Sequence, residues 1–266
     1  MRLAAASVPD RPRGRLIMNA DDWGRDYGTT RAILDGVRSG AVSAVSAMVF
    51  MADSERAARI ARERSIDAGL HLNFTTPLSG PRCPGRVADD QARLAAHLTR
   101  HRFTQVVYRP GLARMFRDVL RAQIDEFDRL YGTTPVRFDG HHHMHLCANL
   151  LLPRLLPAGS LVRRSFSFEA GERNAVNRLY RRLVDAWLAR RHRVVDFFFS
   201  LSPLVPPDRL RRIFALAREH VVEVETHPID PDEYRFLIGG ELFRRLGDLR
   251  VAPPPVPGRP WAPAQS

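Results

Sequence analysis

Apolar and polar positions follow one another in a pattern that predicts strands and helices in turn along most of the chain. Short apolar runs of strand length occur at 15–22, 44–51, 67–74, 136–145, 160–168, 193–200 and 221–228. Apolar residues spaced three and four positions apart predict helices at 29–40, 53–65, 112–132, 174–192 and 207–220. Strands that alternate with helices in this way form parallel sheets through crossover helices. About seven mostly parallel strands in roughly 210 residues favour an α/β fold, an irregular (β/α) barrel that is TIM-barrel-like.

The two ends of the chain differ in composition from this repeating part. Residues 1–14 are polar and contain proline and arginine, whereas residues 251–266 are rich in proline. We therefore expect a flexible N-terminal segment, a single catalytic barrel domain over 15–250 and a disordered tail. Residues 75–108 contain Pro and Gly, which predicts a long irregular loop, and we expect this loop to determine specificity.

Titratable side chains occur where the predicted strands end. Asp21 and Asp22 end the first strand, His71 lies near the end of the third, and Glu225 and His227 end the last. Functional residues of (β/α) barrels lie at the carboxyl ends of the strands. We therefore expect these side chains to meet at one mouth of the barrel.

The fourth predicted strand ends in the histidine-rich stretch FDGHHHMHLC (138–147). Alternation along an extended strand predicts that Asp139, His141, His143 and His145 share one face. A lone histidine is more often a satisfied core residue, and an Asp pair alone is often a helix cap. The coincidence of such segments at several strand ends favours a metal site over a purely structural polar network.

Four motifs resemble those of the YdjC/ChbG family of carbohydrate deacetylases. They are NADDWG (19–24), GLHLN (69–73), DGHHHMH (139–145) and THP (226–228), and the similarity runs from about residue 15 to 237. This resemblance implies an irregular (β/α) barrel. It also implies metal-dependent removal of an N-acetyl group from an amino sugar or short glycan.

The same resemblance implies the roles of individual residues. Asp22, His71 and His141 match the residues that bind one divalent metal ion in the family. Asp21 matches the proposed general base, and His227 matches a late histidine suited to be the general acid. One carboxylate and two imidazoles favour zinc on ligand chemistry, while the family has members assigned magnesium.

Five more residues are expected to contact the substrate or to support the ligands. They are Trp23, Asn73, His143, His145 and Glu225. Trp23 stands where the family more often has Phe, and its indole either stacks on a sugar face or packs against the barrel rim. His143 and His145 remain alternatives to His141 as the ligand. Glu225 either orients His227 or only lines the pocket.

The formal net charge of +12 would by itself suggest a nucleic-acid partner. The chain contains no lysine, however, and its arginines are spread over helical segments such as RAARIARER. That distribution favours solvated helix faces, so we expect no nucleic-acid partner. Apolar runs of about 18 residues are missing, so we expect no membrane span. The N-terminus lacks the apolar run of a signal peptide, which favours the cytoplasm, and a homodimer stays open.

Two other classes of function stay open at this point. A metal-dependent phosphoesterase or another amidohydrolase would use a similar site, although a single Asp-Asp-His-His set argues against a two-metal phosphatase. A carbohydrate- or nucleic-acid-binding protein with a structural metal is the other alternative. Structural zinc sites are closed and four-coordinate, and such a site would leave Asp21 and His227 without a purpose.

Overall fold

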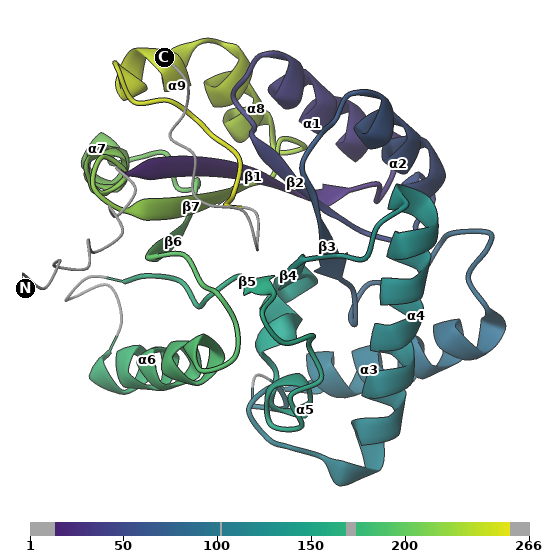
Figure 1. The fold of residues 1–266 in the computed structure, drawn as a ribbon. Helices are drawn as coiled ribbons and strands as arrows, with labels where there is room; N and C mark the ends of the chain where they lie inside the picture. The colour runs from purple at the N-terminus through teal and green to yellow at the C-terminus, as the bar shows by residue number, and fades with distance from the viewer. Residues whose placement is uncertain (1–13, 102, 169–173, 256–266) are drawn as a thin grey trace, which may run out of the picture.

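The computed structural model describes residues 14–101, 103–168 and 174–255, which form one curled sheet with helices along its outer side (Figure 1). The strands are Arg15–Trp23 (β1), Ala44–Ala47 (β2), Ala68–Leu72 (β3), Arg137–Gly140 (β4), Leu161–Val162 (β5), Phe197–Ser200 (β6) and Val221–Thr226 (β7). Their order in the sheet is β5-β4-β3-β2-β1-β7-β6, and every neighbouring pair is parallel. The predicted α/β barrel-like fold is confirmed.

The helices connect the strands and cover the sheet. They are Tyr27–Arg38 (α1), Ser54–Glu63 (α2), Gly85–Arg100 (α3), Ala113–Tyr131 (α4), Ala148–Leu151 (α5), Ala175–Ala189 (α6), Pro207–Leu216 (α7), Pro231–Ile238 (α8) and Glu241–Leu246 (α9). Two 3-10 segments, Pro110–Leu112 (η1) and His141–Leu146 (η2), precede α4 and α5. Among the described residues, none of the helices has both the length and the apolar character that a membrane crossing requires.

The edges of the sheet, β5 and β6, are joined by a few backbone hydrogen bonds. Val162 donates its N–H to the carbonyl of Arg193 (2.9 Å), and Arg193 donates to the carbonyl of Ser160 (2.9 Å). Ser167 donates to the carbonyl of Phe198 (2.8 Å). These bonds lie in the segments around the strands, so the barrel closes irregularly.

The segment 75–108, predicted to be an irregular loop, contains the helix α3. Leu94 and Leu98 of this helix are buried in the same core as Phe116 of α4. Their spacing, together with Val87 and Gln91, is helical and was a usable signal. The prediction of an irregular loop was wrong because the Pro and Gly residues flank the helix without interrupting its apolar spacing.

The fourth strand is also shorter than predicted, since β4 ends at Gly140. His142 (φ 53°) and His143 (φ 57°) adopt left-handed backbone conformations within η2. The prediction that alternate histidines share a strand face is therefore wrong. A Cβ atom on Gly140 would lie 2.9 Å from the backbone nitrogen of His145, so the chain folds back tightly against this glycine.

The predicted terminal segments lie only partly within the described residues. Residues 1–13 and 256–266 lie outside them. Val251 forms a parallel bridge with Leu16, and Ala252 donates its N–H to the carbonyl of Leu16 (2.8 Å). The first residues of the predicted tail therefore lie against the start of β1.

Side chains alternate between the barrel interior and the helix layer along the strands. In β1, Leu16 and Met18 pack in the core that contains Phe214 of α7, while Ile17 packs inside the barrel with Phe198. Nearer the carboxyl ends of the strands the interior becomes polar. Its buried members include Asn19, Ser46, Arg137, Asp139, Arg163 and Glu223.

Gly69 of β3 makes room for one of these polar side chains. The guanidinium group of Arg137 crosses this position and donates to Asn19 Oδ1 (2.8 Å), to the Val45 carbonyl (3.0 Å) and to Asp67 Oδ1 (2.8 Å). A Cβ atom on Gly69 would lie 2.8 Å from Arg137 Cζ.

Gly69→Ala is expected to lower the free energy of unfolding by about 1–3 kcal/mol, because the guanidinium group is held by fixed acceptors and cannot move aside. Urea denaturation measures this change. Gly85→Ala is the control, since a Cβ atom there would meet nothing within 4 Å and alanine favours a helix. Equal stability of Gly69→Ala and the unmodified protein would contradict the packing described here.

Candidate metal centre and catalytic residues

Asp21 and Asp22 lie in an irregularity near the end of β1. The register between β1 and β2 shifts between Ala20 and Trp23, and Asp22 has a left-handed backbone (φ 68°). Successive side chains of a regular strand point to opposite faces. The bulge instead allows both carboxylates to be buried toward the same mouth of the barrel.

Three buried side chains converge beside this bulge. Asp22 Oδ1 lies 2.9 Å from His141 Nδ1 and 3.4 Å from His71 Nε2. One ligand atom from each of the three residues lies within 4.8 Å of the other two. The end of β1, the end of β3 and the start of η2 thus bring together the residues predicted to bind a metal.

The hydrogen bonds of this group orient its possible ligand atoms. His71 Nδ1 lies 2.8 Å from Asp139 Oδ1, to which it donates because a carboxylate only accepts, so Nε2 is the ring atom directed at Asp22. Burial lowers the pKa of His71, but Asp21, Asp139 and Asp22 outweigh it and raise that pKa to about 10, so a metal ion would take the place of the proton on Nε2. Asp22 Oδ1 is buried and has no hydrogen-bond partner among the described residues. Ligand atoms bound at about 2.0–2.2 Å to one tetrahedral ion stand roughly 3–4 Å apart. The group could therefore hold a divalent metal ion.

An arginine that the sequence did not single out holds the carboxylates around this group. Arg163 is buried and donates from Nη1 to Asp21 Oδ2 (2.7 Å), from Nη2 to Asp21 Oδ1 (2.8 Å) and from Nε to Glu223 Oε1 (2.8 Å). Its guanidinium group also lies 3.2 Å from Asp139 Oδ2 and 3.3 Å from Glu225 Oε2. Arg163 directly follows β5, so the rule about strand ends was a usable signal for it.

Buried carboxylates outnumber buried guanidinium groups in this interior. The carboxylates are those of Asp21, Asp22, Asp139, Glu223 and Glu225, and the guanidinium groups are those of Arg137 and Arg163. Burial raises the pKa of Asp21, but the charges of Arg163 and His71 outweigh it and hold that pKa below its ordinary value. Burial and the nearby Asp21 raise the pKa of Glu225 well above its ordinary range. A bound cation would favour the ionised form of these carboxylates.

A second set of possible ligand atoms, from Asp21, His71 and Asp139, overlaps the first. Arg163 already contacts both of these carboxylates, and Asp139 accepts the hydrogen of His71 Nδ1. A positive charge is therefore already present at this position. The arrangement supports one metal ion better than the pair that a two-metal phosphatase would need.

Trp23 and Asn73, both predicted to lie near the substrate, instead contact the protein itself. Trp23 is 0% exposed and packs in the apolar core, so the structure offers no face of its indole on which a sugar could stack. The side chain of Asn73 accepts from the N–H groups of Thr75 (3.1 Å) and Thr76 (2.9 Å) and donates to the Thr76 carbonyl (2.7 Å). Its amide therefore shapes the turn after β3.

His143 and His145 lie beside the proposed ligand group. The Nε2 of His145 is 2.9 Å from the Arg163 carbonyl, to which it donates, so His145 helps to position that arginine. Burial lowers the pKa of His145 to about 4, which keeps the ring neutral. His143 Nε2 lies 3.8 Å from Glu225 Oε2, and its ring packs edge-on against Phe166 at 4.6 Å.

His227 directly follows β7. Thr226 is paired with Ala20 in the sheet, so His227 lies next to the bulge of β1. The backbone N–H of His227 donates to Glu233 Oε2 (2.6 Å), and the residue is half-buried. Glu225 was predicted either to orient His227 or only to line the pocket. Its carboxylate lies near Arg163 and His143.

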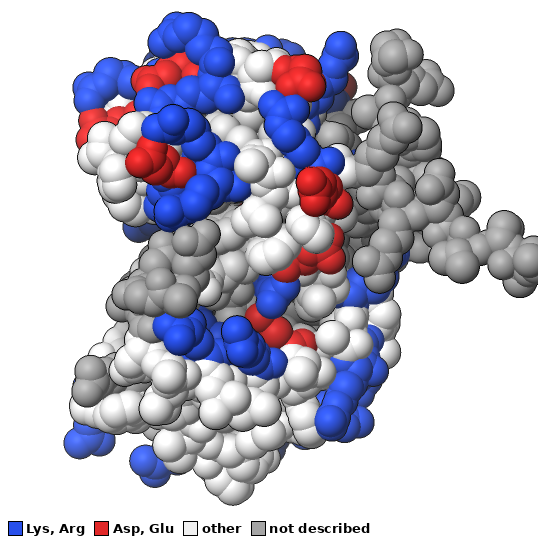
Figure 2. Space-filling model, turned by 90° about the vertical axis from the view of Figure 1, so that its left-hand side faces the viewer, with Lys and Arg blue, Asp and Glu red and all other residues white. Residues whose placement is uncertain are grey.

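Arginines on the outer faces of the helices pair with nearby acids. Arg129 contacts Glu126, and Arg245 contacts Glu241, at spacings of one helical turn. Figure 2 shows basic and acidic side chains side by side on the face that it presents. This is the arrangement expected of solvated helix faces.

Comparison with known proteins links the site to a family. The sequence profile of the family described as YdjC-like protein matches residues 15–245. The carbohydrate deacetylase of Homo sapiens is 35% identical over 149 residues, which cover 51% of this chain and 42% of the human protein. The carbohydrate deacetylase of Vibrio cholerae serotype O1 is 26% identical over 240 residues, covering 89% of this chain and 87% of that protein. The chitooligosaccharide deacetylase of Yersinia pestis is 30% identical over 145 residues, covering 53% of each.

Two solved structures share the fold. A candidate cellobiose-phosphate cleavage protein from Enterococcus faecalis V583 has a TM-score of 0.65 and 18% identity, covering 91% of this chain and 97% of that chain. The catalytic domain of peptidoglycan N-acetylglucosamine deacetylase from Eubacterium rectale ATCC 33656 has a TM-score of 0.50 and 11% identity, covering 98% and 97%. The aligned part spans less than half of the human relative, whereas the family profile spans most of the present chain. The chain therefore belongs to the YdjC-like protein family.

Proposed function

We propose that this protein is a metal-dependent N-deacetylase that hydrolyses the N-acetyl group of an amino sugar or short glycan. One observation carries the proposal: possible ligand atoms of Asp22, His71 and His141 converge beside the ionised carboxylate of Asp21. The names of the carbohydrate and chitooligosaccharide deacetylases in the same comparison support the choice of substrate class.

Amide hydrolysis needs help at three points, because an amide is a poor electrophile with a poor leaving group. Asp22, His71 and His141 would hold a divalent metal ion, which would act as a Lewis acid and would lower the pKa of its bound water from about 15.7 toward 7. The remaining tasks are to accept a proton from the attacking water and to give one to the departing nitrogen. Side chains of this chain perform both.

Asp21 is the proposed general base. Its Oδ1 accepts hydrogen bonds from Arg163 Nη2 (2.8 Å) and Asn19 Nδ2 (2.8 Å), whereas Oδ2 accepts from Arg163 Nη1 (2.7 Å). Oδ2 keeps a lone pair that can accept the proton of water. The lowered pKa weakens Asp21 as a base, but it keeps the carboxylate charged and held in one orientation.

Two imidazoles are candidates for the general acid. His227 matches the family motif and lies beside the bulge that carries Asp21. His143 is the competing candidate, because it lines a cavity of about 180 Å³ next to the ligand group. We assign the role to His227, since the contact of His143 with Glu225 and Phe166 suits it to line the substrate site.

The cavity beside His143 is the proposed entrance for the sugar. Aromatic side chains of Phe166 and Tyr180 and the amide of Gln105 line it. Apolar faces with a few polar groups are typical of small-molecule sites. Gln105 belongs to the segment 75–108, which supports the expectation that this segment influences specificity.

Metal-reconstituted protein is expected to release acetate from N-acetylglucosamine oligomers, and a chelator is expected to stop the reaction. Asp21→Asn should retain the metal while kcat falls by about 10²–10⁴-fold, because the base is lost.

Asp22→Ala and His141→Ala should lose the metal. Elemental analysis and an acetate assay measure both quantities.

Full metal content in His141→Ala would show that the ligand assignment is wrong. Release of phosphate from phosphoesters, without release of acetate from the oligomers, would replace the deacetylase by a phosphoesterase. Thermal unfolding of each variant shows whether a loss of activity reflects a loss of folding.

His227→Ala is expected to lower kcat by about 10²–10⁴-fold, because the departing nitrogen loses its proton donor. His143→Ala is expected to change mainly KM, because the side chain lines the substrate cavity. Steady-state kinetics on the same oligomer separates these effects. A large fall in kcat for His143→Ala alone would transfer the acid role to His143.

Arg163→Lys tests the positioning of the base. Lysine supplies a single point charge and cannot hold both oxygens of Asp21 as the guanidinium fork does. We expect kcat to fall by about 10–100-fold with metal content unchanged. We also expect the acidic limb of the pH–rate profile to move to higher pH, because the pKa of Asp21 is no longer held as low. An unchanged acidic limb would show that Arg163 acts only on stability.

A further inference from the structure

A cavity of about 230 Å³ lies on the side of the barrel where the strands begin. One wall comes from residues 150–156, at the end of α5 and before β5, and the other from residues 187–192, at the end of α6 and before β6. The proposed metal ligands follow the ends of β1, β3 and β4. Because all the strands are parallel, the cavity and the metal ligands lie at opposite ends of the barrel.

Three arginines line this cavity, Arg154, Arg190 and Arg191. Within residues 14–101, 103–168 and 174–255, their guanidinium groups form no hydrogen bond or ion pair, unlike Arg129 and Arg245 on the helices. Like charges around one cavity repel one another, and the described residues that line it include no carboxylate. A bound anion would remove this repulsion.

The cavity has fixed walls and a further polar atom. Trp187 Nε1 donates to the Leu151 carbonyl (3.3 Å), and the guanidinium carbons of Arg154 and Arg190 lie 5.1 Å and 5.6 Å from the centre of the Trp187 ring. The Nδ1 atom of His192, which also lines the cavity, is buried without a hydrogen-bond partner in the described part of the chain.

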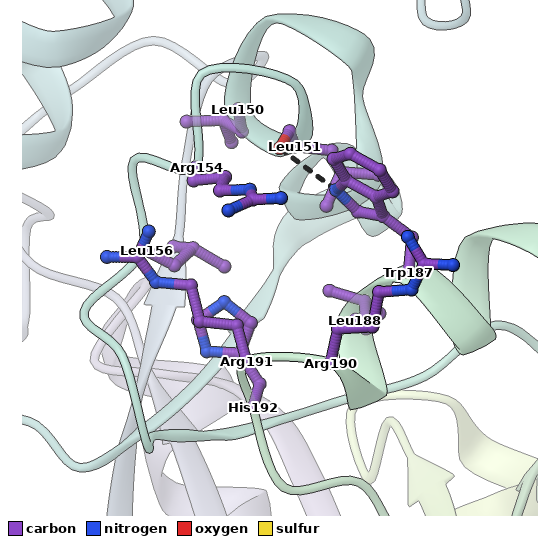
Figure 3. Close-up of a pocket in the computed structure, with 9 residues that line it drawn as sticks. All are labelled: Leu150, Leu151, Arg154, Leu156, Trp187, Leu188, Arg190, Arg191 and His192. Atoms are coloured by element: carbon purple, nitrogen blue, oxygen red, sulfur yellow. Dashed lines mark hydrogen bonds between the residues drawn. The ribbon is translucent and has the colours of Figure 1, made fainter.

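Figure 3 shows how these side chains surround the opening. Arg154, Arg191 and His192 stand around one side of it, and Trp187 and Leu188 stand across from them. The guanidinium group of Arg154 reaches over this space, those of Arg190 and Arg191 extend outward from its rim, and an aromatic and aliphatic wall stands opposite.

The size and chemistry of the cavity suit a small phosphorylated molecule. Its volume is below the roughly 300–1,000 Å³ of sites for drug-sized ligands. Guanidinium forks match phosphate oxygens, and a dianionic phosphate can use several of them at once. The leucine side chains on the walls would pack against a short organic part. We propose that this cavity binds the phosphate group of a small phosphomonoester, at a site separate from the metal centre.

Isothermal titration calorimetry with glucose 6-phosphate, inorganic phosphate and glucose tests the proposal, at constant ionic strength and with the full chain. Both phosphate compounds are expected to bind, and glucose is not. Equal affinities would show that the phosphate group alone is recognised, whereas tighter binding of glucose 6-phosphate would show that the walls contact the sugar. Arg154→Gln and Arg191→Gln should each weaken binding by about tenfold or more, because each removes a charge-assisted hydrogen bond.

Arg117→Gln is the matched control, because it removes an equal charge from an exposed position in α4. It should leave the affinity within about twofold, a change too small to reflect a lost hydrogen bond. Asp22→Ala separates this cavity from phosphate bound at the metal centre, and it should leave the affinity unchanged. The proposal is overturned by no binding at about 10 mM ligand, by equal binding of glucose, by equal weakening in Arg117→Gln, or by binding that only Asp22→Ala abolishes.

Discussion

The guanidinium group of Arg163 balances the charges of the barrel interior, because it contacts the carboxylates of Asp21, Asp139, Glu223 and Glu225 together. Four carboxylates removed from water without this cation would each cost several kcal/mol. The strand that carries Arg163 is only two residues long, Leu161–Val162. Its position therefore depends on these ion pairs as well as on the sheet. The backbone contributes through Arg163 N–H, which donates to the Phe138 carbonyl (3.0 Å).

Arg163 also connects the proposed metal ligands with the proposed general base Asp21. Asp139 lies between them, with Oδ2 3.2 Å from Arg163 Nη2 and Oδ1 2.8 Å from His71 Nδ1. A single carboxylate thus sets the orientation of a proposed ligand, while the same arginine holds the proposed base Asp21. Positions fixed in this way need no rearrangement during the reaction, which is the main physical advantage of a buried polar network over an exposed one.

The sequence indicated which strands carry the candidate site residues at their ends. It did not indicate where the backbone departs from regular strand geometry. Asp22 and His71 were visible because each is a polar residue at the end of an apolar run, whereas the choice of His141 among the neighbouring histidines rested on the family motif. The bulge at Asp22 and the left-handed His142 were not visible, because they arise from tertiary contacts such as Gly140 against His145. The position of Arg163 after a strand was a signal in the sequence, but its partners were not visible there. Arg163 has many alternatives among the 41 basic residues, and only the folded barrel shows which carboxylates surround it.

The arginine-rich composition has three different physical consequences in this fold. Arg137 and Arg163 neutralise buried carboxylates inside the barrel, and arginines such as Arg129 pair with acids on helix surfaces. At a net charge of +12, the arginines outnumber the acids that could pair with them one to one. An isolated exposed arginine is stabilised by water alone, but three around one concave space share a field that attracts anions. The net charge of the chain is the same whether its unpaired arginines are scattered or grouped. The ability of such a chain to bind anions therefore depends on where several of these arginines surround one cavity.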